Sequence, residues 1–158
     1  MREMRIRPAR AADAGAITEL VHASSAYQGG YASILDGYEV TGAQVEATVT
    51  FLAEDDAGDV VGCYSLVPGD AELDLLFVAD AAQGTGLGAR LVRHMLERAR
   101  ELGLTSVRVV SHPPAEGFYR RTGAVRVGTV PAKPPKVPYE RPELRWNLVA
   151  DRTGDVFV

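Results

Sequence analysis

The sequence has little of what a disulfide bond, a membrane span or a leader peptide requires. It contains a single cysteine, Cys63, in 158 residues, so no internal disulfide can form and a reducing cytoplasm is the expected compartment. No apolar run approaches the roughly 20 residues that a membrane span requires. The first seven residues, Met-Arg-Glu-Met-Arg-Ile-Arg, lack the apolar core of a signal peptide. We therefore expect a soluble cytoplasmic protein with no membrane partner.

An excess of basic charge is absent as well. The formal net charge is −4, and the basic residues are interspersed with acids, which argues against a nucleic-acid partner. The three histidines and the one cysteine show no metal-ligand spacing, so no metal ion is expected. With 46% hydrophobic and 24% charged residues, the composition is typical of one globular domain, predicted over residues 1–150 with a frayed tail at 151–158.

The most informative segment is a glycine-rich turn from Gln83 to Arg90, which reads Gln-Gly-Thr-Gly-Leu-Gly-Ala-Arg. It lies between a strand-like run at 73–79 and a strongly helical run at 87–102. Three glycines in five residues leave backbone N–H groups unshielded, and the positive end of the following helix dipole points to the same place. Such a turn suits a phosphate or pyrophosphate group.

Two common phosphate-binding motifs fit this turn poorly. A Walker-type loop ends in Gly-Lys-Ser/Thr, whereas this turn ends in Gly-Ala-Arg. A dinucleotide fingerprint is matched in letters by Gly84, Gly86 and Ala89. It also requires an acidic residue roughly 20 positions later, and the corresponding stretch 104–112 contains none. The dinucleotide interpretation therefore stays a weaker alternative.

Taken as Gln83-x-x-Gly86-x-Gly88, the turn resembles the acyl-CoA pyrophosphate loop of the GNAT superfamily of N-acetyltransferases. A second segment, 112–124, resembles the later signature of that family, where a short helix carrying Phe-Tyr follows a strand and ends at Gly plus a small residue. The order also matches: glycine turn, amphipathic helix, strand, short helix, strand. Together these features cover about 73–130, near a third of the chain.

The resemblance implies acetyl-CoA as co-substrate. A backbone N–H near Phe77 and Val78 is implied to polarise the thioester carbonyl, and the peptide groups of both are implied to pair with pantetheine. The full set implied to hold the coenzyme is Phe77, Val78, Gln83, Gly84, Thr85, Gly86, Leu87, Gly88 and Ala89. Pro114 stands where many family members carry an Asn that contacts the coenzyme, so that contact is expected to be absent.

Hydrophobic periodicity predicts the order of the elements. The predicted strands are 4–7, 48–53, 60–67, 72–78, 105–111, 124–130 and 144–149, and the predicted helices are 11–26, 41–47, 87–102 and 115–122. The helix at 87–102 has one apolar face and ends at Gly103 as a left-handed cap. Because this helix crosses between them, strands 72–78 and 105–111 are expected to be parallel. The expected fold is α/β, with a mixed, mostly antiparallel sheet of six or seven strands and helices on both faces, in agreement with the GNAT resemblance.

Acetyl transfer to an amine needs a proton acceptor for the amine, stabilisation of the oxyanion and a proton donor for the departing thiolate. By resemblance, Tyr119 takes the position of the general acid, and a phenol is neutral at pH 7 and can donate. Packing of a short helix is its alternative role. Glu72 and Asp74 lie two apart on one predicted strand, so both side chains project from one face and either could be the base. A solvated strand face is the alternative for both.

Other residues carry a weaker signal. His112 follows a strand and precedes Pro113, which favours a surface histidine over an active-site one. Cys63 lies in an apolar strand and is expected to be inert. For the acceptor, the resemblance implies walls from loops 27–41 and 130–142. In the first loop, Tyr27, Tyr31 and Tyr38 could line a pocket, and Asp36 and Glu39 could attract a cationic amine. Solvated loop residues are the alternative.

The leading hypothesis is an acetyl-CoA-dependent N-acetyltransferase that acts on the primary amine of a small molecule by direct attack in a ternary complex. A non-catalytic acyl-CoA-binding or sensing module is one alternative. Acetylation of a protein N-terminus or lysine is another, and it requires an open groove. The sequence leaves open the identity of the amine, the length of the acyl group, and the choice between monomer and homodimer.

Overall fold

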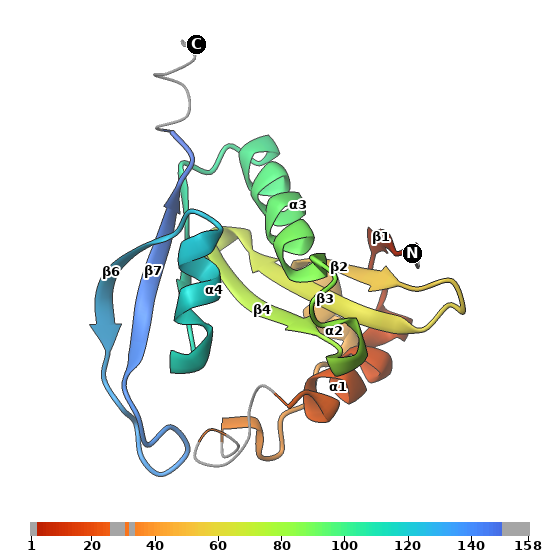
Figure 1. Cartoon of the computed structure of the whole chain (residues 1–158), viewed down its shortest axis with the longest axis horizontal. Helices are drawn as coiled ribbons and strands as arrows, with labels where there is room; N and C mark the ends of the chain where they lie inside the picture. Colours follow the sequence, from red (N-terminus) through yellow and green to blue (C-terminus); the bar gives the residue numbers. More distant parts are fainter. Residues whose placement is uncertain (1–2, 26–30, 32–33, 150–158) are drawn as a thin grey trace.

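Seven strands form one sheet with helices on both faces (Figure 1). The computed structural model describes residues 3–25, 31 and 34–149. The strands are β1 (Arg5–Pro8), β2 (Val49–Glu54), β3 (Val60–Val67), β4 (Glu72–Val78), β5 (Ser106–Val110), β6 (Val125–Val130) and β7 (Arg141–Asn147). The helices are α1 (Ala14–Ala23), α2 (Gly42–Ala47), α3 (Leu87–Glu101) and α4 (Glu116–Arg121).

The strand order across the sheet is β1-β2-β3-β4-β5-β7-β6. Every neighbouring pair is antiparallel except β4 and β5, which are parallel because α3 crosses between them. The expected mixed, mostly antiparallel α/β sheet with helices on both faces is therefore confirmed.

Each face of the sheet packs against its own helices. On one face α3 and α4 cover a cluster whose fully buried members include Tyr64, Leu91 and Met95. On the other face α1 packs on β3 and β4, and Ile17 and Leu52 are fully buried there. These two layers hold β3 and β4 between them, so the central strands are rigidly placed from both sides.

The end of α3 follows the sequence prediction. Gly103 has a φ of +81°, its N–H donates to the carbonyl of Arg100, and the N–H of Leu104 donates to the carbonyl of Ala99. This pair of bonds is a Schellman motif, which satisfies the last carbonyls of the helix and turns the chain toward β5.

Two predicted elements differ from the observed ones. The predicted helix 11–26 is shorter, because a 3₁₀ turn precedes α1 and the backbone is already extended at Ser24. The predicted strand 144–149 instead starts at Arg141 and includes Pro142. A proline is tolerated there because β5 has ended, so no β5 carbonyl requires its missing N–H, and its carbonyl accepts a hydrogen bond from the N–H of Ser111.

A β-bulge breaks the alternation of β4 at Asp74. Opposite this residue the register jumps, since Leu66 pairs with Leu73 and Ser65 pairs with Leu75. As a consequence Leu73 belongs to the core beneath α3, whereas Leu75 packs on the α1 side. The extra residue of a bulge bends a strand away from its partner, and β4 diverges from β5 in this region.

Candidate active site

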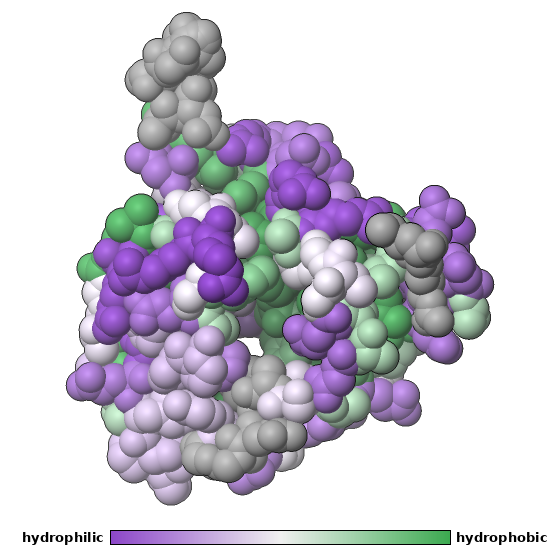
Figure 2. Space-filling model, in the orientation of Figure 1, coloured by the Kyte–Doolittle hydropathy of each residue, from purple (hydrophilic) through white to green (hydrophobic). Residues whose placement is uncertain are grey.

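A cleft of about 840 Å³ opens where β4 and β5 separate. The two strands share one register pair, Glu72 with Arg108, and their remaining residues diverge. The cleft lies between the end of α1, the start of α3, and α4, and apolar side chains gather in the hollow near the middle of the face in Figure 2. The divergence leaves one edge of β4 without a strand partner, so its backbone is available to a ligand.

The peptide groups on this free edge belong to alternate residues of β4. The N–H of Ala79 donates to Val61 on β3, and the register pairs Gly62 with Val78. Because hydrogen-bonded and non-hydrogen-bonded pairs alternate in an antiparallel ladder, the N–H and C=O of Val78 point away from β3, and those of Leu76 do the same. Consistent with this direction, Gln83 Nε2 donates to the Val78 carbonyl at 3.1 Å.

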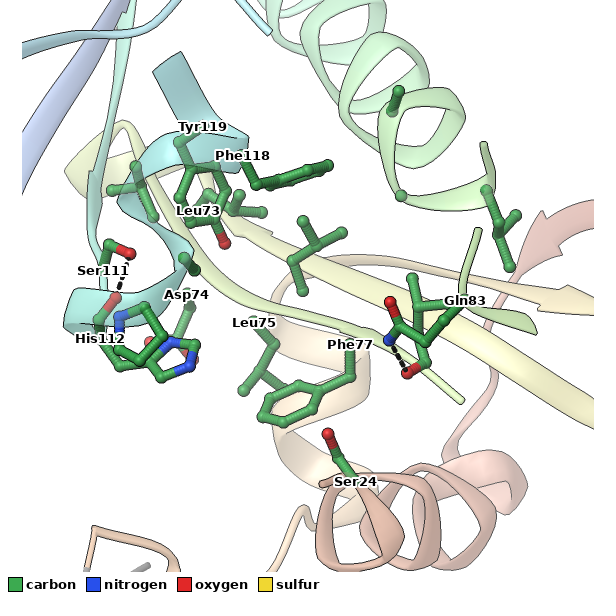
Figure 3. Close-up of a pocket in the computed structure, with 18 of the residues that line it drawn as sticks. Ser24, Leu73, Asp74, Leu75, Phe77, Gln83, Ser111, His112, Phe118 and Tyr119 are labelled. Atoms are coloured by element: carbon green, nitrogen blue, oxygen red, sulfur yellow. Dashed lines mark hydrogen bonds between the residues drawn. The ribbon is translucent and has the colours of Figure 1, made fainter. Parts of the chain in front are cut away.

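The peptide groups of Phe77 do not face the cleft, contrary to the expectation that they pair with pantetheine. Its register partner is Cys63, so its own peptide groups face β3 rather than the cleft. The buried Phe77 side chain does line the cleft (Figure 3). The sequence pattern missed Leu76, because only the register shows which amides remain free.

The glycine turn forms one end of the cleft. Gly84 and Gly86 have φ angles of +78° and +83°, a left-handed conformation that glycine adopts without strain. At Gly88, a Cβ atom would lie 3.2 Å from two ring atoms of Phe118, so glycine is required for the close approach of α3 and α4. The first N–H groups of α3 have no intrahelical acceptor and, with the helix dipole, favour an anion.

The side chains of Thr85 and Leu87 stabilise the turn and the start of α3 through contacts within the protein. The Thr85 hydroxyl donates to the Ala82 carbonyl at 2.6 Å and accepts from the Leu87 N–H at 3.4 Å. The Leu87 side chain is buried, and a Cβ atom placed on Gly62 would lie 3.0 Å from it. A diphosphate fits this part of the cleft, because Gly84, Gly86, Gly88 and the small Ala89 line it and leave their amides uncovered.

Tyr119 is placed by α4 with its hydroxyl directed into the cleft (Figure 3). The residue is 7% exposed, and its ring makes edge contacts with Phe118 at 5.2 Å and Trp146 at 5.7 Å. Trp146 is itself fixed, because its Nε1 donates to the Thr122 hydroxyl at 3.0 Å. A phenol held by aromatic packing, with its polar end toward the cleft, suits a proton donor at a defined position.

Glu72 and Asp74 both line the cleft, but their surroundings differ. Glu72 accepts a hydrogen bond from Arg108 Nη1 at 3.2 Å. Burial raises the pKa of Glu72, and the charge of Arg108 opposes that rise. Asp74 has no such partner among the described residues, and burial alone raises the pKa of its carboxyl although the side chain remains accessible from the cleft. An unpaired carboxylate with a raised pKa is the better proton acceptor of the two.

The predicted acceptor loops meet the cleft only in part. Tyr38 lines it, and burial raises the pKa of its phenol to about 12. Asp36 and Glu39 are exposed and do not line the cleft, which supports the interpretation of these acids as solvated loop residues. Tyr27 lies outside the described residues. Tyr31 reaches the site from beside it, with its ring 6.0 Å from that of His112.

His112 and Arg141 are the cleft residues that sequence reasoning undervalued. His112 is half-buried and lines the cleft, which favours the interpretation that it reaches the mouth of the site. Arg141 lines the same cleft from the start of β7. Because the predicted strand began at residue 144, Arg141 was assigned to a loop. Alternation extended back from Trp146 and Leu144 would have placed Arg141 on the face of β7 that is not buried.

The single cysteine and a further histidine lie outside the cleft. Cys63 is fully buried, and burial raises the pKa of its thiol to about 12, in line with the expected inert core residue. His94 Nδ1 lies 2.7 Å from the buried Tyr64 hydroxyl, a contact that joins α3 to β3. Within 3–25, 31 and 34–149 no group of three or more histidine, cysteine or acidic side chains could hold a metal ion. No helix in this described part has the length and apolar character to cross a membrane.

Comparison with known proteins connects this geometry to a family. A model of the acetyltransferase (GNAT) family matches residues 17–124. An amino-acid acetyltransferase from Ralstonia nicotianae is 32% identical over 105 residues, which is 59% of this chain and 23% of that protein. The match therefore spans about a quarter of the length of that relative.

Solved structures share the fold over nearly the whole chain. The ribosomal-protein-S18-alanine N-acetyltransferase from Escherichia coli aligns with a TM-score of 0.70 at 14% identity, covering 92% of this chain and 94% of that one. The structure of yncA from Salmonella typhimurium with its cofactor acetyl-CoA aligns with a TM-score of 0.68 at 21% identity, covering 92% and 94%. At such low identity these similarities show the fold alone.

Proposed function

This chain belongs to the GNAT family of acetyltransferases, and we propose that it transfers the acetyl group of acetyl-CoA to the primary amine of a small molecule by direct attack. One observation carries the proposal: the glycine turn, the free edge of β4, the Tyr119 hydroxyl and the Asp74 carboxylate all line one cleft. The relative named an amino-acid acetyltransferase supports a small-molecule acceptor. The predicted cytoplasmic location and the choice between monomer and homodimer remain predictions from the sequence.

The donor end of the cleft suits acetyl-CoA, which when bound supplies an acetyl thioester. The free amides of the turn at Gly86, Gly88 and Ala89 would hold its pyrophosphate. The outward peptide groups of Val78, which lies beside the turn, would pair with an amide of its pantetheine arm, as an added strand would. Pro114 lines the cleft and has no N–H, so it offers no donor there.

The proton transfers are assigned to two side chains. Asp74 accepts the ammonium proton, directly or through water, so that the amine is neutral when it attacks. Tyr119 donates its hydroxyl proton to the departing sulfur. The outward N–H of Leu76, which lies farther from the glycine turn than that of Val78, is the backbone donor for the oxygen that gains charge. We assign the base to Asp74 rather than Glu72, because Arg108 already occupies the Glu72 carboxylate.

The first test is the coenzyme. Acetyl-CoA should raise the melting temperature, because a ligand at 100 times its dissociation constant adds about 2.7 kcal/mol to the stability. NAD at the same concentration should give no shift, and a shift with NAD alone would reinstate a dinucleotide site. Replacing Gly86 by Val should abolish the acetyl-CoA shift, since φ is +83° there and a branched side chain would cover the amides. The unliganded melting temperature of Gly86→Val serves as its folding control.

The second test is turnover. Thiol release from acetyl-CoA, measured against a panel of small primary amines, should exceed the rate without acceptor. Stabilisation by acetyl-CoA without thiol release for any amine would favour the non-catalytic binding module. Release with a peptide amine but with no small amine would favour a protein acceptor.

A further inference from the structure

The acceptor side of the cleft carries a charge pattern that specifies more than an amine. On β7 every second residue is buried, and Leu144 and Trp146 belong to the core that α4 covers. The alternate residues Arg141, Glu143 and Arg145 therefore lie on the opposite face. Glu72 of β4 and Arg108 of β5 share that face, since they are register partners and bond to each other and to the same group of charges.

Most of these charges neutralise one another. Arg108 bridges two carboxylates, with Nη1 3.2 Å from Glu72 and Nε 3.1 Å from Glu143. Arg145 adds a longer contact of 3.8 Å to Glu143. Two arginines and two glutamates thus form a closed network whose net charge is zero, and it has no charge left for a ligand.

Arg141 stands outside this network. It lines the cleft, its Nε is buried without a hydrogen-bond partner, and it makes no ion pair within the described ranges. A guanidinium stays charged at any physiological pH, and a buried donor without an acceptor costs free energy. An anion in the cleft would supply the acceptor that this guanidinium lacks.

The neighbour of Arg141 points to the same requirement. The Tyr139 hydroxyl is also buried without a hydrogen-bond partner. Burial raises the pKa of Tyr139, while the charge of nearby Arg141 opposes the rise, so the phenol remains a donor at neutral pH. Its ring is held against Tyr31 at a centroid distance of 4.9 Å. Tyr139 lies beside the cleft rather than among its lining residues, so its phenol and the Arg141 Nε are two unsatisfied donors at this edge of the site.

Asp74 supplies the opposite charge on the β4 side of the same cleft. No hydrogen bond or ion pair within the described part of the chain engages its carboxylate, in contrast to Glu72. The cleft thus contains an unpaired acid on β4 and an unpaired base on β7. A molecule that carries both an ammonium and an anionic group complements this pattern.

We propose that the acceptor is an amino-carboxylate, and that Arg141, assisted by Tyr139, binds its carboxylate while the amine faces Asp74. A carboxylate matches the planar donor fork of arginine in a bidentate pair. This inference rests on the proposed acetyl transfer. It makes Arg141 a determinant of acceptor specificity, with no part in the proton transfers.

The test compares substrates that differ only in the carboxylate. Each L-amino acid is assayed beside its α-amide and its decarboxylated amine, with thiol release as the readout. The rates are compared at equal concentrations of the neutral amine. The wild-type protein should prefer one or more acids over the matched amides by about 10- to 100-fold in kcat/KM, the range expected for hydrogen bonds to a charged group. Arg141→Gln should remove this preference mainly through KM. Arg141→Lys should retain part of it, because it keeps the charge but not the planar fork.

Arg145→Gln is the matched control, since it removes an arginine from the same face of the same strand but outside the cleft lining. This variant should keep the wild-type preference. Equal use of acids and amides by the wild type, or an unchanged preference in Arg141→Gln, would overturn the inference and leave acetyl transfer standing. If the wild type shows neither thiol release nor stabilisation by acetyl-CoA, the proposed function itself is refuted.

A binding measurement decides the matter without turnover. With the protein saturated by CoA, an amino acid that occupies the site should raise the melting temperature of the wild type and of Arg145→Gln, but not of Arg141→Gln. An intact shift with CoA alone shows that Arg141→Gln is folded. If that variant does not fold, Arg141→Lys and the wild-type comparison of acids with amides carry the test. No response of the wild type to any carboxylate-bearing amine would count against the inference.

Discussion

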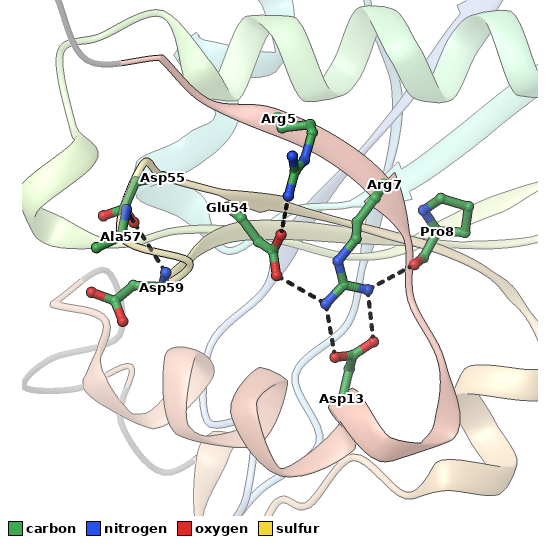
Figure 4. A network of polar contacts seen from close by, with 8 residues as sticks. All are labelled: Arg5, Arg7, Pro8, Asp13, Glu54, Asp55, Ala57 and Asp59. Atoms are coloured by element: carbon green, nitrogen blue, oxygen red, sulfur yellow. Dashed lines mark hydrogen bonds and ion pairs between the residues drawn. The ribbon is translucent and has the colours of Figure 1, made fainter.

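Two aspartates in different regions of the molecule, Asp13 and Asp74, show how this fold divides its charges. Asp13 lies at the start of α1, where both its oxygens accept from Arg7 at 3.0 Å (Figure 4). Arg7 also bonds to Glu54 at 3.0 Å, so the three side chains tie β1, α1 and β2 together. Asp74 sits on the β4 bulge and faces an open cleft with no bonded partner in the described chain.

The two environments move the pKa in opposite directions. Hydrogen bonds from Arg7 lower the pKa of Asp13, whereas burial raises the pKa of Asp74. Folding therefore favours the ionised form of Asp13 and disfavours the ionised form of Asp74. The same residue type stabilises the structure at one place and is kept reactive at the other. Changes at the cleft should cost activity and changes in the Arg7 network should cost stability.

The largest effect is expected at the proposed acid. Tyr119→Phe keeps the ring that packs on Trp146 and deletes only the hydroxyl that faces the cleft. Turnover should fall by about 10² or more, while the shift caused by acetyl-CoA changes little. Steady-state thiol release and thermal melts measure both. Wild-type turnover in this variant would reduce Tyr119 to a packing residue.

The next effect should separate the two carboxylates of β4. With Asp74 as base, activity on an alkylamine should rise from acid pH to a plateau, with the rise above the ordinary aspartate pKa because burial raises it. Asp74→Asn should lower the plateau by roughly 10- to 100-fold, or move the rise toward the pKa of the free amine. Glu72→Gln is the matched variant, and its profile should keep the wild-type position. A profile that moves only in Glu72→Gln would transfer the role of base to Glu72.

Asp74→Asn also sharpens the comparison through stability. Because the folded-state pKa of Asp74 is raised, its ionisation lowers stability as the pH rises through that pKa. At neutral pH the Asn variant should therefore be as stable as the wild type or slightly more stable. Thermal melts at neutral pH provide the measurement, and a clear loss of stability would assign Asp74 a structural role.

The smallest effect is expected in the network of Arg7, Asp13 and Glu54. Asp13→Asn keeps an oxygen that can accept from the Arg10 N–H but removes the charge opposite Arg7. Stability at neutral pH should fall by about 1–2 kcal/mol, as for a lost charge-assisted hydrogen bond in a partly buried site. The kcat should be unchanged.

The pH dependence of stability gives the sign of that contribution. The pKa of Asp13 is lowered in the folded state, so its contribution is present above the unfolded value of 3.8 and is lost as the pH falls through the folded pKa. The Asn variant should therefore lose less stability than the wild type on acidification. Denaturant unfolding at neutral and acid pH measures the difference, and parallel curves for both proteins would contradict the prediction.

Local patterns predicted much of the fold and part of the site. The limits of β4, the apolar face of α3 and its glycine cap follow from alternation, helical spacing and the left-handed preference of glycine, which act over a few residues. The glycine turn and Tyr119 were found through a resemblance of short motifs. The start of β7 was missed because Pro142 breaks a strand only where a neighbour needs its N–H, and no local rule contains the neighbour.

The sequence by itself determined the order of the elements, the character of the sheet and the glycine turn, because these depend on neighbours along the chain. Only the tertiary structure decided which charges are paired. Glu72 finds Arg108 across 36 residues, while Asp74 and Arg141 reach the same cleft with no ion pair to any residue that the structure describes. The register of β4 likewise assigned the free amides to Leu76 and Val78. The pairing of charges and the freedom of amides depend on distances between strands, and these exist only once the sheet has formed.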